Sequence, residues 1–197
     1  MKVAIDWRCG VSTKIYIDQG HNPRDYNTGA EGNGFFEQDI TYKIGILLAD
    51  LLRANPDFEV RLSRPTEDTL LGTSNTSSLA ARVRDANRWG ADAFISLHTN
   101  ASPNPSATGA EALIYDNSAT VARELSDEIL DELTRVTGLR NRGIIERPGL
   151  YVLKATSMPA TIIEMGFISN PYDAELMAYS PQLFAEGIYR GIVEYYD

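Results

Sequence analysis

The 197-residue sequence predicts an α/β fold, a single layered domain with a mixed, mostly parallel sheet of about six strands flanked by helices. Short runs of β-branched and other apolar residues alternate with longer segments whose apolar residues recur at helical spacing. Several of the short runs are apolar enough to be strands buried on both faces. Strands that alternate with helices in this way favour a layered α/β domain.

Six short runs are predicted strands, because their apolar and β-branched residues favour that structure. In chain order they are IYID (15–18), EVRLS (59–63), DAFISLH (92–98), ALIY (112–115), LYVLK (150–154) and ATIIE (160–164). Two polar segments, 65–78 and 99–109, are rich in Thr, Ser, Pro and Asn and are predicted loops near one edge of the sheet.

Four amphipathic helices are predicted between and after the strands. In the first, the helical pattern of apolar residues ends at Asn55-Pro56. The second has Ser77 or Ser78 as its cap and Gly90 after its end. The last has proline at its first position. The predicted helices cover 37–54, about 79–89, about 119–137, and the segment that begins at Ser180-Pro181.

The composition argues against several classes of partner. The length suits one domain that covers residues 1–197. The net charge is −9, so neither nucleic acid nor an anionic membrane is attracted by the overall field. No segment reaches the roughly 18 apolar residues of a membrane span. We expect a monomer.

The N-terminal segment carries no visible signal peptide. Asp6 and Arg8 interrupt the stretch MKVAIDWRCG, where a signal peptide needs unbroken apolar residues. Residues 1–13 are interpreted as a possible leader or extension. Cys9 is the only cysteine, so no intramolecular disulfide is possible, and we assign it no role.

Two histidines and a glutamate mark a predicted site. His21 and His98 are the only histidines, and each follows a predicted strand. Glu164 ends a third strand. Ligand sites in open α/β sheets lie beyond the carboxyl ends of strands. We therefore expect these three side chains to meet at one edge of the sheet.

Structural interpretations of these residues compete with the functional one. A single histidine at a strand end is usually a satisfied structural residue. Glu164 lies between Ile162-Ile163 and Met165-Gly166-Phe167, so its carboxylate is expected to be partly buried. Burial is costly unless the charge is paired or used. It also raises a carboxyl pKa toward a value that suits a general base near neutral pH.

Two imidazoles and one carboxylate are a common ligand set for catalytic zinc, and a second carboxylate then moves the proton. The residues alone do not select the ligating carboxylate. Glu37 also has a structural interpretation, because an acid in the first turn of a helix interacts well with the helix dipole. The open candidates are Asp18, Asp25, Glu31, Glu37, Asp39, Asp92 and Glu111.

A series of short motifs extends from Lys14 to the C-terminus. They are Asp18-Gln19-Gly20-His21, the glycine-rich stretch 29–34, Glu37, Leu62-Ser63-Arg64 with Asp68, Arg82 with Ala86-Asn87, FISLHTNA (94–101), Val152-Leu153-Lys154, Met158-Pro159-Ala160 and IEMGFISN (163–170). In order and spacing, the series resembles the zinc-dependent N-acetylmuramoyl-L-alanine amidases (amidase type 3), which release stem peptides from the glycan strands of bacterial peptidoglycan. One motif alone would be weak, whereas the whole set is highly specific.

The resemblance implies a ligand set and a reaction. It implies that His21, Glu37 and His98 bind zinc and that Glu164 is the catalytic acid/base. The implied reaction is hydrolysis of the amide between the lactyl group of N-acetylmuramic acid and L-alanine. Peptidoglycan is then the expected partner, and the cell wall or extracellular space is the expected place of action.

The sequence departs from the family pattern in three ways. Gln19 stands where the family usually has proline, and Asn22-Pro23 replaces a common glycine pair, so we expect altered substrate fit without loss of zinc. Some members carry an extra helix that plugs the site, whereas 118–149 is mostly accounted for by one helix and a short loop, so we expect an open site. Arg64 and Asn87 are interpreted as structural. Asn100 either orients a ligand or contacts substrate.

Two other functions remain open. The first is a zinc hydrolase that acts on another amide, such as a carboxypeptidase or a small-molecule deacylase. A carboxypeptidase needs a cation for the terminal carboxylate, and the candidates are Arg64, Arg123, Arg142 and Arg147. The second is a wall-binding module without catalysis, against which the intact set of His21, Glu37, His98 and Glu164 speaks.

Overall fold

The computed structural model describes residues 12–197. Cys9 and nearly all of the predicted leader or extension therefore lie outside the described residues. The main sheet has six strands in the order β4-β1-β5-β8-β6-β7, and every neighbouring pair is parallel except β6 with β8. The strands are β1 (Thr13–Gln19), β4 (Phe58–Leu62), β5 (Ala93–Asn100), β6 (Ala110–Ile114), β7 (Asn141–Glu146) and β8 (Ala160–Phe167). A separate two-stranded ribbon joins β2 (Glu31–Gly32) and β3 (Phe35–Phe36). The predicted α/β class is confirmed.

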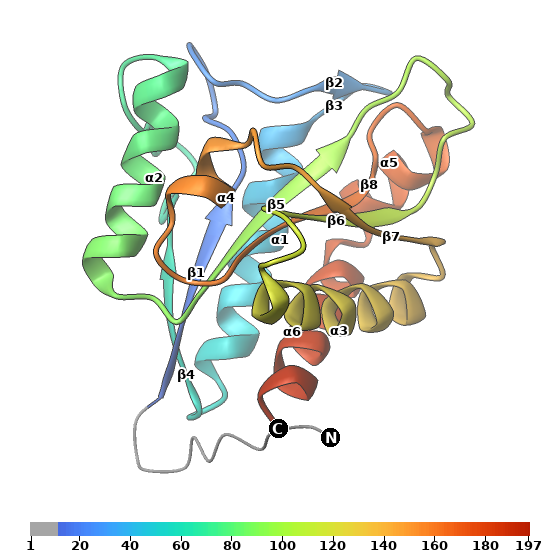
Figure 1. Ribbon diagram of the computed structural model, residues 1–197. Helices are drawn as coiled ribbons and strands as arrows, with labels where there is room; N and C mark the ends of the chain where they lie inside the picture. The colour runs from blue at the N-terminus through green and yellow to red at the C-terminus, as the bar shows by residue number, and fades with distance from the viewer. Residues whose placement is uncertain (1–11) are drawn as a thin grey trace.

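Helices cover both faces of this sheet (Figure 1). One face carries α1 (Glu37–Arg53), α3 (Thr120–Thr137), α5 (Pro171–Tyr179) and α6 (Pro181–Tyr196), and their apolar sides join the larger buried cluster. The other face carries α2 (Asn75–Trp89) and α4 (Tyr151–Ala155) over a smaller apolar cluster. No helix within residues 12–197 combines the length and the apolar character that crossing a membrane requires.

The start of α2 corrects two predictions. Ser74, and not Ser77 or Ser78, is the N-cap: its hydroxyl accepts the backbone N–H of Ser77, and the Ser77 hydroxyl accepts the backbone N–H of Ser74. This reciprocal pair is a capping box, in which a serine replaces the usual glutamate. The last four residues of the predicted loop 65–78 are therefore helical. Gly90 ends the helix as predicted, in the left-handed conformation with φ of 68°.

The run LYVLK (150–154) is not a strand, and that prediction is wrong. It forms α4, in which Val152 and Leu153 are buried together while Tyr151 is exposed. A short apolar run does not distinguish a buried strand from one helical turn. The main sheet instead contains β7, a strand that was not predicted because its residues are half-buried or exposed. The short helix α5 was also missed, although Asn170 caps it and Pro171 is its first residue.

Candidate metal centre

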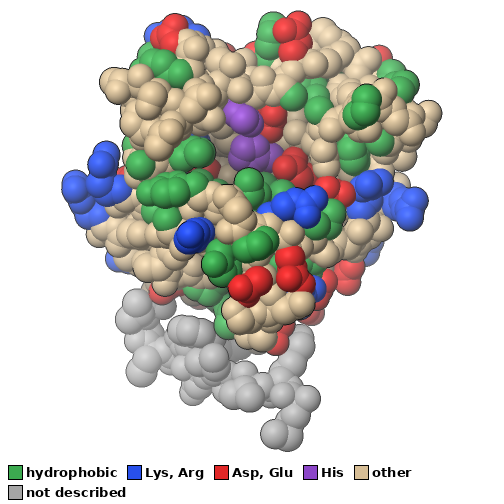
Figure 2. Space-filling view, turned by 45° about the horizontal axis from the view of Figure 1, so that its top comes forward, with side chains coloured by type: hydrophobic (Ala, Val, Ile, Leu, Met, Phe, Trp, Pro, Cys, Tyr) green, Lys and Arg blue, Asp and Glu red, His purple; other side chains and the backbone are tan. Residues whose placement is uncertain are grey.

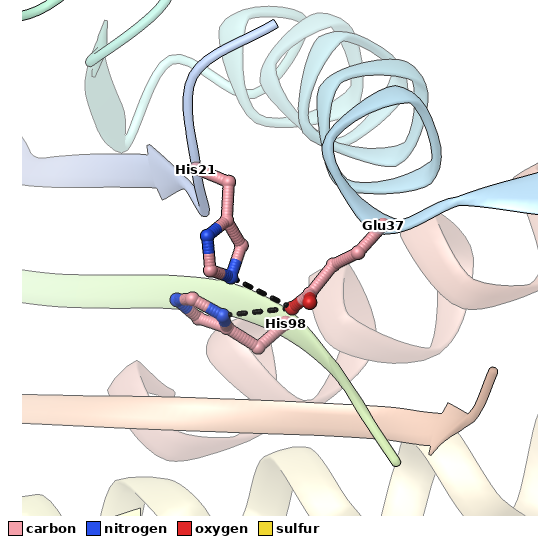
Figure 3. A group of neighbouring side chains, drawn as sticks. All are labelled: His21, Glu37 and His98. Carbon is pink, nitrogen blue, oxygen red and sulfur yellow. Dashed lines mark hydrogen bonds and ion pairs between the residues drawn. The ribbon is translucent and has the colours of Figure 1, made fainter. Parts of the chain in front are cut away.

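Three side chains from separate parts of the chain meet at the carboxyl edge of the sheet (Figure 3). His21 follows β1, Glu37 is the first residue of α1, and His98 lies near the end of β5. The Glu37 Oε1 atom lies 3.2 Å from His21 Nε2 and 2.9 Å from His98 Nδ1. One candidate ligand atom from each residue falls within 4.8 Å of the others. Both imidazoles therefore point at one shared centre.

His21 is held in a backbone conformation that few non-glycine residues adopt, with φ of 70°. The Arg82 guanidinium donates to the His21 carbonyl at 2.5 Å, which fixes the turn. The His21 Nδ1 atom lies 3.2 Å from the Asn27 carbonyl oxygen, which can only accept. Nδ1 therefore carries a proton, and Nε2, which faces the centre, is the ring nitrogen that could bind a metal.

Glu37 is buried and its carboxylate is fully engaged. Oε1 also accepts the backbone N–H of Thr99 at 3.0 Å, and Oε2 accepts that of Ala30 at 2.8 Å. Burial alone would raise the pKa of Glu37, but the hydrogen bonds from His21 and His98 bring this pKa far below its usual range. Burial alone would lower the pKa of His98, and the Glu37 carboxylate raises it. The carboxylate is thus ionised where it faces the two rings.

Two glycines allow this close approach. A Cβ atom at Gly20 would lie 2.5 Å from the Leu97 carbonyl oxygen and 2.6 Å from the His98 ring. A Cβ atom at Gly29 would lie 2.6 Å from the Glu37 Cβ atom and 2.9 Å from the His21 ring. A side chain at either position would push the cluster apart, so glycine is needed here for its small size.

A buried ion pair supports the cluster from behind. Arg82, on α2, is 1% exposed and donates to the Asp18 carboxylate at 2.5 Å and to the Gln19 carbonyl at 2.6 Å. Ser96 donates to the other Asp18 oxygen at 2.8 Å. Asp18 was an open candidate for the ligating carboxylate, but its two oxygens are committed to Arg82 and Ser96. Its role in the structure is to anchor α2 to β1.

Glu164 lies directly beside His98, because β8 pairs with β5 in parallel and these two residues are in register. Its Oε2 atom is buried and has no hydrogen-bond partner within the described part of the chain. Burial raises the pKa of Glu164 to about 7; the nearby His98 opposes the shift, and Glu37 and Glu111 add to it. A carboxyl group of this kind exchanges protons near neutral pH.

Glu111 continues the row across the sheet, since it pairs with Glu164 in the antiparallel register of β6 and β8. It is 6% exposed, and it accepts from Asn100 Nδ2 at 2.8 Å and from Arg142 Nε at 2.7 Å. Asn100 therefore orients the Glu111 carboxylate, which is not one of the three candidate metal ligands, so this contact matches neither of the two roles predicted for Asn100. Arg142 is the one arginine among the carboxypeptidase candidates that is bonded to this row.

The remaining predicted structural residues behave as expected. Arg64 is fully buried and donates to the carbonyls of Gln38 and Glu67. The Asn87 side chain links α2 to the end of α4, through the Ala155 carbonyl and the Ser157 N–H. Neither touches the cluster.

Two of the three departures from the family pattern, Gln19 and Asn22, form cross-links between loops. Gln19 accepts the Arg64 backbone N–H at 2.8 Å and donates to the Arg64 carbonyl at 3.0 Å. Asn22 makes the same kind of paired contact with Leu71, and it also donates to the Tyr26 carbonyl. These side chains fix the shape of the loop around His21 and lie outside the ligand set.

The cluster is open to solvent on one side. The side chains of His21 and His98 are each 21% exposed, beside a hollow of about 120 Å³. Figure 2 shows both rings at the bottom of a depression between two raised parts of the surface, with acidic side chains next to them. Between α3 and α4 the described chain contains only β7 and short turns, with no helix that could plug the site.

Fold and side chains together define an α/β protein with a candidate divalent-metal site at the carboxyl edge of its sheet. Within residues 12–197, the group His21, Glu37 and His98 is the one with metal-binding geometry. The residues named by the resemblance therefore lie together, and the local signal that singles out Glu37 is its place as the first residue of a helix that starts at the edge of the sheet.

The chain belongs to the N-acetylmuramoyl-L-alanine amidase family, whose sequence pattern matches residues 15–194. It is 36% identical over 179 residues to the N-acetylmuramoyl-L-alanine amidase CwlM of Bacillus licheniformis, covering 90% of this chain and 65% of that protein. It is 31% identical over 204 residues to the germination-specific amidase of Bacillus subtilis (strain 168), covering 96% and 83%. The crystal structure of an N-acetylmuramoyl-L-alanine amidase from Clostridium difficile 630 superposes with a TM-score of 0.83 at 29% identity, covering 93% of this chain and 96% of that one.

Proposed function

We propose that this chain is the catalytic domain of a zinc-dependent amidase that cleaves the bond between N-acetylmuramic acid and L-alanine in peptidoglycan. The observation that carries the proposal is the convergence of His21, Glu37 and His98 on one point, with Glu164 on the adjacent strand. Family membership supports the reaction. The proposal also places the protein at the cell wall, acting as a monomer.

The donor set fits zinc. Two neutral imidazoles and one carboxylate are a frequent ligand set at catalytic zinc sites, which keep a further position open. The Asn27 carbonyl holds the His21 ring in the tautomer that leaves Nε2 free, and backbone N–H groups hold both oxygens of Glu37. Such outer contacts orient metal ligands. When bound, zinc would supply Lewis acidity toward the amide carbonyl.

Glu164 performs the proton transfer in this proposal. Its carboxylate accepts a proton from the attacking water and delivers it to the nitrogen of L-alanine. The carbon–nitrogen bond breaks, a carbon–oxygen bond forms, and the products are a lactyl carboxylate and a free amine. The partly exposed cluster suits a polymeric substrate, which must reach the carbonyl from solvent.

A pair of substitutions separates the two roles. His98→Ala is expected to lose zinc and turnover together, because one of three protein ligands is removed. Glu164→Gln is expected to retain zinc and to lose turnover by a factor of about 10² to 10⁴, the range attributed to general acid–base catalysis. Glu175→Gln on the exposed side of α5 is the matched control and should match the unmodified protein.

The measurements are zinc content by atomic emission and product masses after digestion of purified peptidoglycan. Free L-alanine amino termini and intact glycan are expected; free amino acids from the peptide end would instead identify a carboxypeptidase. Near-normal turnover by Glu164→Gln would remove that residue from its assigned role. Wall binding without any product would support the wall-binding module.

A further inference from the structure

A second and larger hollow, of about 580 Å³, lies at the outer edge of the sheet. Its walls come from the edge strand β4, the adjoining segment 63–71, one side of α2 and Arg53 at the end of α1. It shares no lining residue with the hollow beside the two histidines. The proposed reaction leaves this feature without a role.

The lining of this hollow is strongly basic. Four arginines and one aspartate contribute to it, which leaves three positive charges in a protein whose net charge is −9. The charged lining residues are Arg53, Arg61, Arg84, Arg88 and Asp85. A local field of this sign, opposite to that of the whole molecule, favours an anionic ligand. Basic side chains gather at the left margin of Figure 2, the side on which α2 lies in Figure 1.

Two of these arginines are unneutralised. Arg61 is paired with Asp85 at 2.9 Å, and Arg53 lies 3.6 Å from Asp50. Within the part of the chain that the structure describes, the guanidinium groups of Arg84 and Arg88 have neither an ion pair nor a hydrogen bond. They stand four residues apart on α2, so they are neighbours on one helix face and repel each other. A bound anion would relieve this repulsion.

The strand below adds backbone donors. Because β4 is the outermost strand, it pairs only with β1, and alternate backbone N–H groups face away from the sheet. Val60 and Leu62 line the hollow from this strand. The site thus combines guanidinium forks with main-chain donors, both of which bind phosphate oxygens well.

We propose that this hollow binds a ligand that carries at least two phosphate groups. The volume exceeds that of a single phosphate, and the four guanidinium groups come from three separate elements, so one small anion does not reach them all. The two unneutralised arginines, Arg84 and Arg88, match a ligand that carries at least two negative charges. Such a ligand is either a free oligophosphate or a phosphodiester segment of a longer polymer. The proposal is independent of the amidase reaction.

Isothermal titration calorimetry with the full chain tests the proposal. The probes are tripolyphosphate, a linear glycerol-phosphodiester trimer, inorganic phosphate and triglutamate. At least one of the first two is expected to bind at least about 10-fold more tightly than phosphate or triglutamate, with affinity falling between about 50 and 200 mM salt. Tighter binding of tripolyphosphate would indicate a free oligophosphate as the ligand, and tighter binding of the phosphodiester trimer would indicate a segment of a longer polymer.

Arg84→Gln/Arg88→Gln is expected to weaken this binding by at least about 10-fold, since it removes two charged donors. Arg135→Gln/Arg190→Gln makes the same change of charge at two exposed sites on α3 and α6 and should leave binding within about two-fold. Cleavage of peptidoglycan should be the same in all three proteins.

Equal weakening by both double variants, or triglutamate binding as tightly as the phosphate compounds, would mean that attraction is only general and would overturn the proposal. Absence of binding by every probe at millimolar concentration would do the same. All four arginines are exposed, so the thermal midpoint of each variant should stay close to that of the unmodified chain. If the double variant is unstable, the single variant Arg88→Gln replaces it in the calorimetric titration.

Discussion

The helices on the two faces of the sheet are held by different kinds of contact. On the face of α3 and α6 the contacts are apolar and very close: a Cβ atom at Gly191 would lie 2.4 Å from the Ile129 Cα atom. On the face of α2, the buried Arg82 reaches through to Asp18 and to the loop that carries His21. The contact between α3 and α6 therefore supplies mainly stability, whereas α2 also positions the loop that carries one candidate metal ligand, His21.

The largest effect is expected from Arg82→Met. It leaves the Asp18 carboxylate buried without its partner, which should lower the free energy of unfolding by about 3 to 5 kcal/mol. Zinc affinity should fall as well, because the His21 carbonyl loses its donor. Urea unfolding and a competitive zinc titration measure the two quantities.

Arg88→Met on the same helix is the control, since Arg88 is exposed; its unfolding free energy should change by no more than about 0.5 kcal/mol. If Arg82→Met kept normal zinc affinity, the polar face would have no positioning role.

Gly191→Ala tests the apolar face. The added methyl group meets backbone atoms of α3, which cannot move aside cheaply, so a loss of about 1 to 3 kcal/mol in unfolding free energy is expected. Zinc affinity should be unchanged. Gly149→Ala adds the same group where nothing lies within 4 Å and should be neutral or slightly stabilising. A change of zinc affinity in Gly191→Ala would contradict the separation of the two faces.

Gly29→Ala should have the opposite effect to Gly191→Ala: zinc affinity falls while stability changes little. Its methyl group would lie 2.6 Å from the Glu37 Cβ atom, so the carboxylate must shift away from the two rings. We expect zinc affinity to fall by about 10- to 100-fold, with a change of less than about 1 kcal/mol in the stability of the metal-free protein. Zinc affinity within two-fold of normal would show that the loop adjusts freely.

The smallest effect is a dependence of stability on pH. Burial alone would raise the pKa of Asp18, but Arg82 lowers it below the ordinary value of 3.8. The unfolded chain then takes up this proton at a higher pH than the folded chain, so the stabilisation is complete above that value and is lost as pH falls through the folded pKa. Asp18→Asn should therefore lie well below the unmodified protein at pH 6 and approach it in acid. Asp50→Asn, an exposed control, should follow the unmodified curve. A constant gap between Asp18→Asn and the unmodified protein would contradict this.

Much of the fold follows from periodicity. Helices with long apolar faces, such as α1 and α3, and strands buried on both faces, such as β1 and β5, were predicted within a few residues. The failures are short elements. The helix α4 has only five residues, and the half-buried and exposed residues of β7 follow no alternation. In these cases tertiary contact, rather than local pattern, selects the structure.

In the candidate site, too, some residues were predictable from the sequence and others depend on tertiary contacts. The sequence places His21 and His98 close to strand ends, as the structure does, whereas Glu164 does not end its strand, because β8 continues to Phe167. The register of β5 and β8 brings His98 and Glu164 side by side. Glu37 was one of seven candidate carboxylates and was selected only through the family resemblance, because its approach to the two histidines depends on how α1 enters the sheet edge. The role of Asp18 as the partner of Arg82 depends on a contact across 64 residues, which no local pattern encodes.

The Gln19 side chain fills a space that one helix leaves for it. A Cβ atom at Gly45, in the middle of α1, would lie only 2.4 Å from the Gln19 Cγ atom. A proline at position 19 would vacate that space and remove both bonds to Arg64. The two positions therefore form a matched pair in this chain: Gln19→Pro would open a void beside Gly45, and Gly45→Ala would clash with the Gln19 side chain.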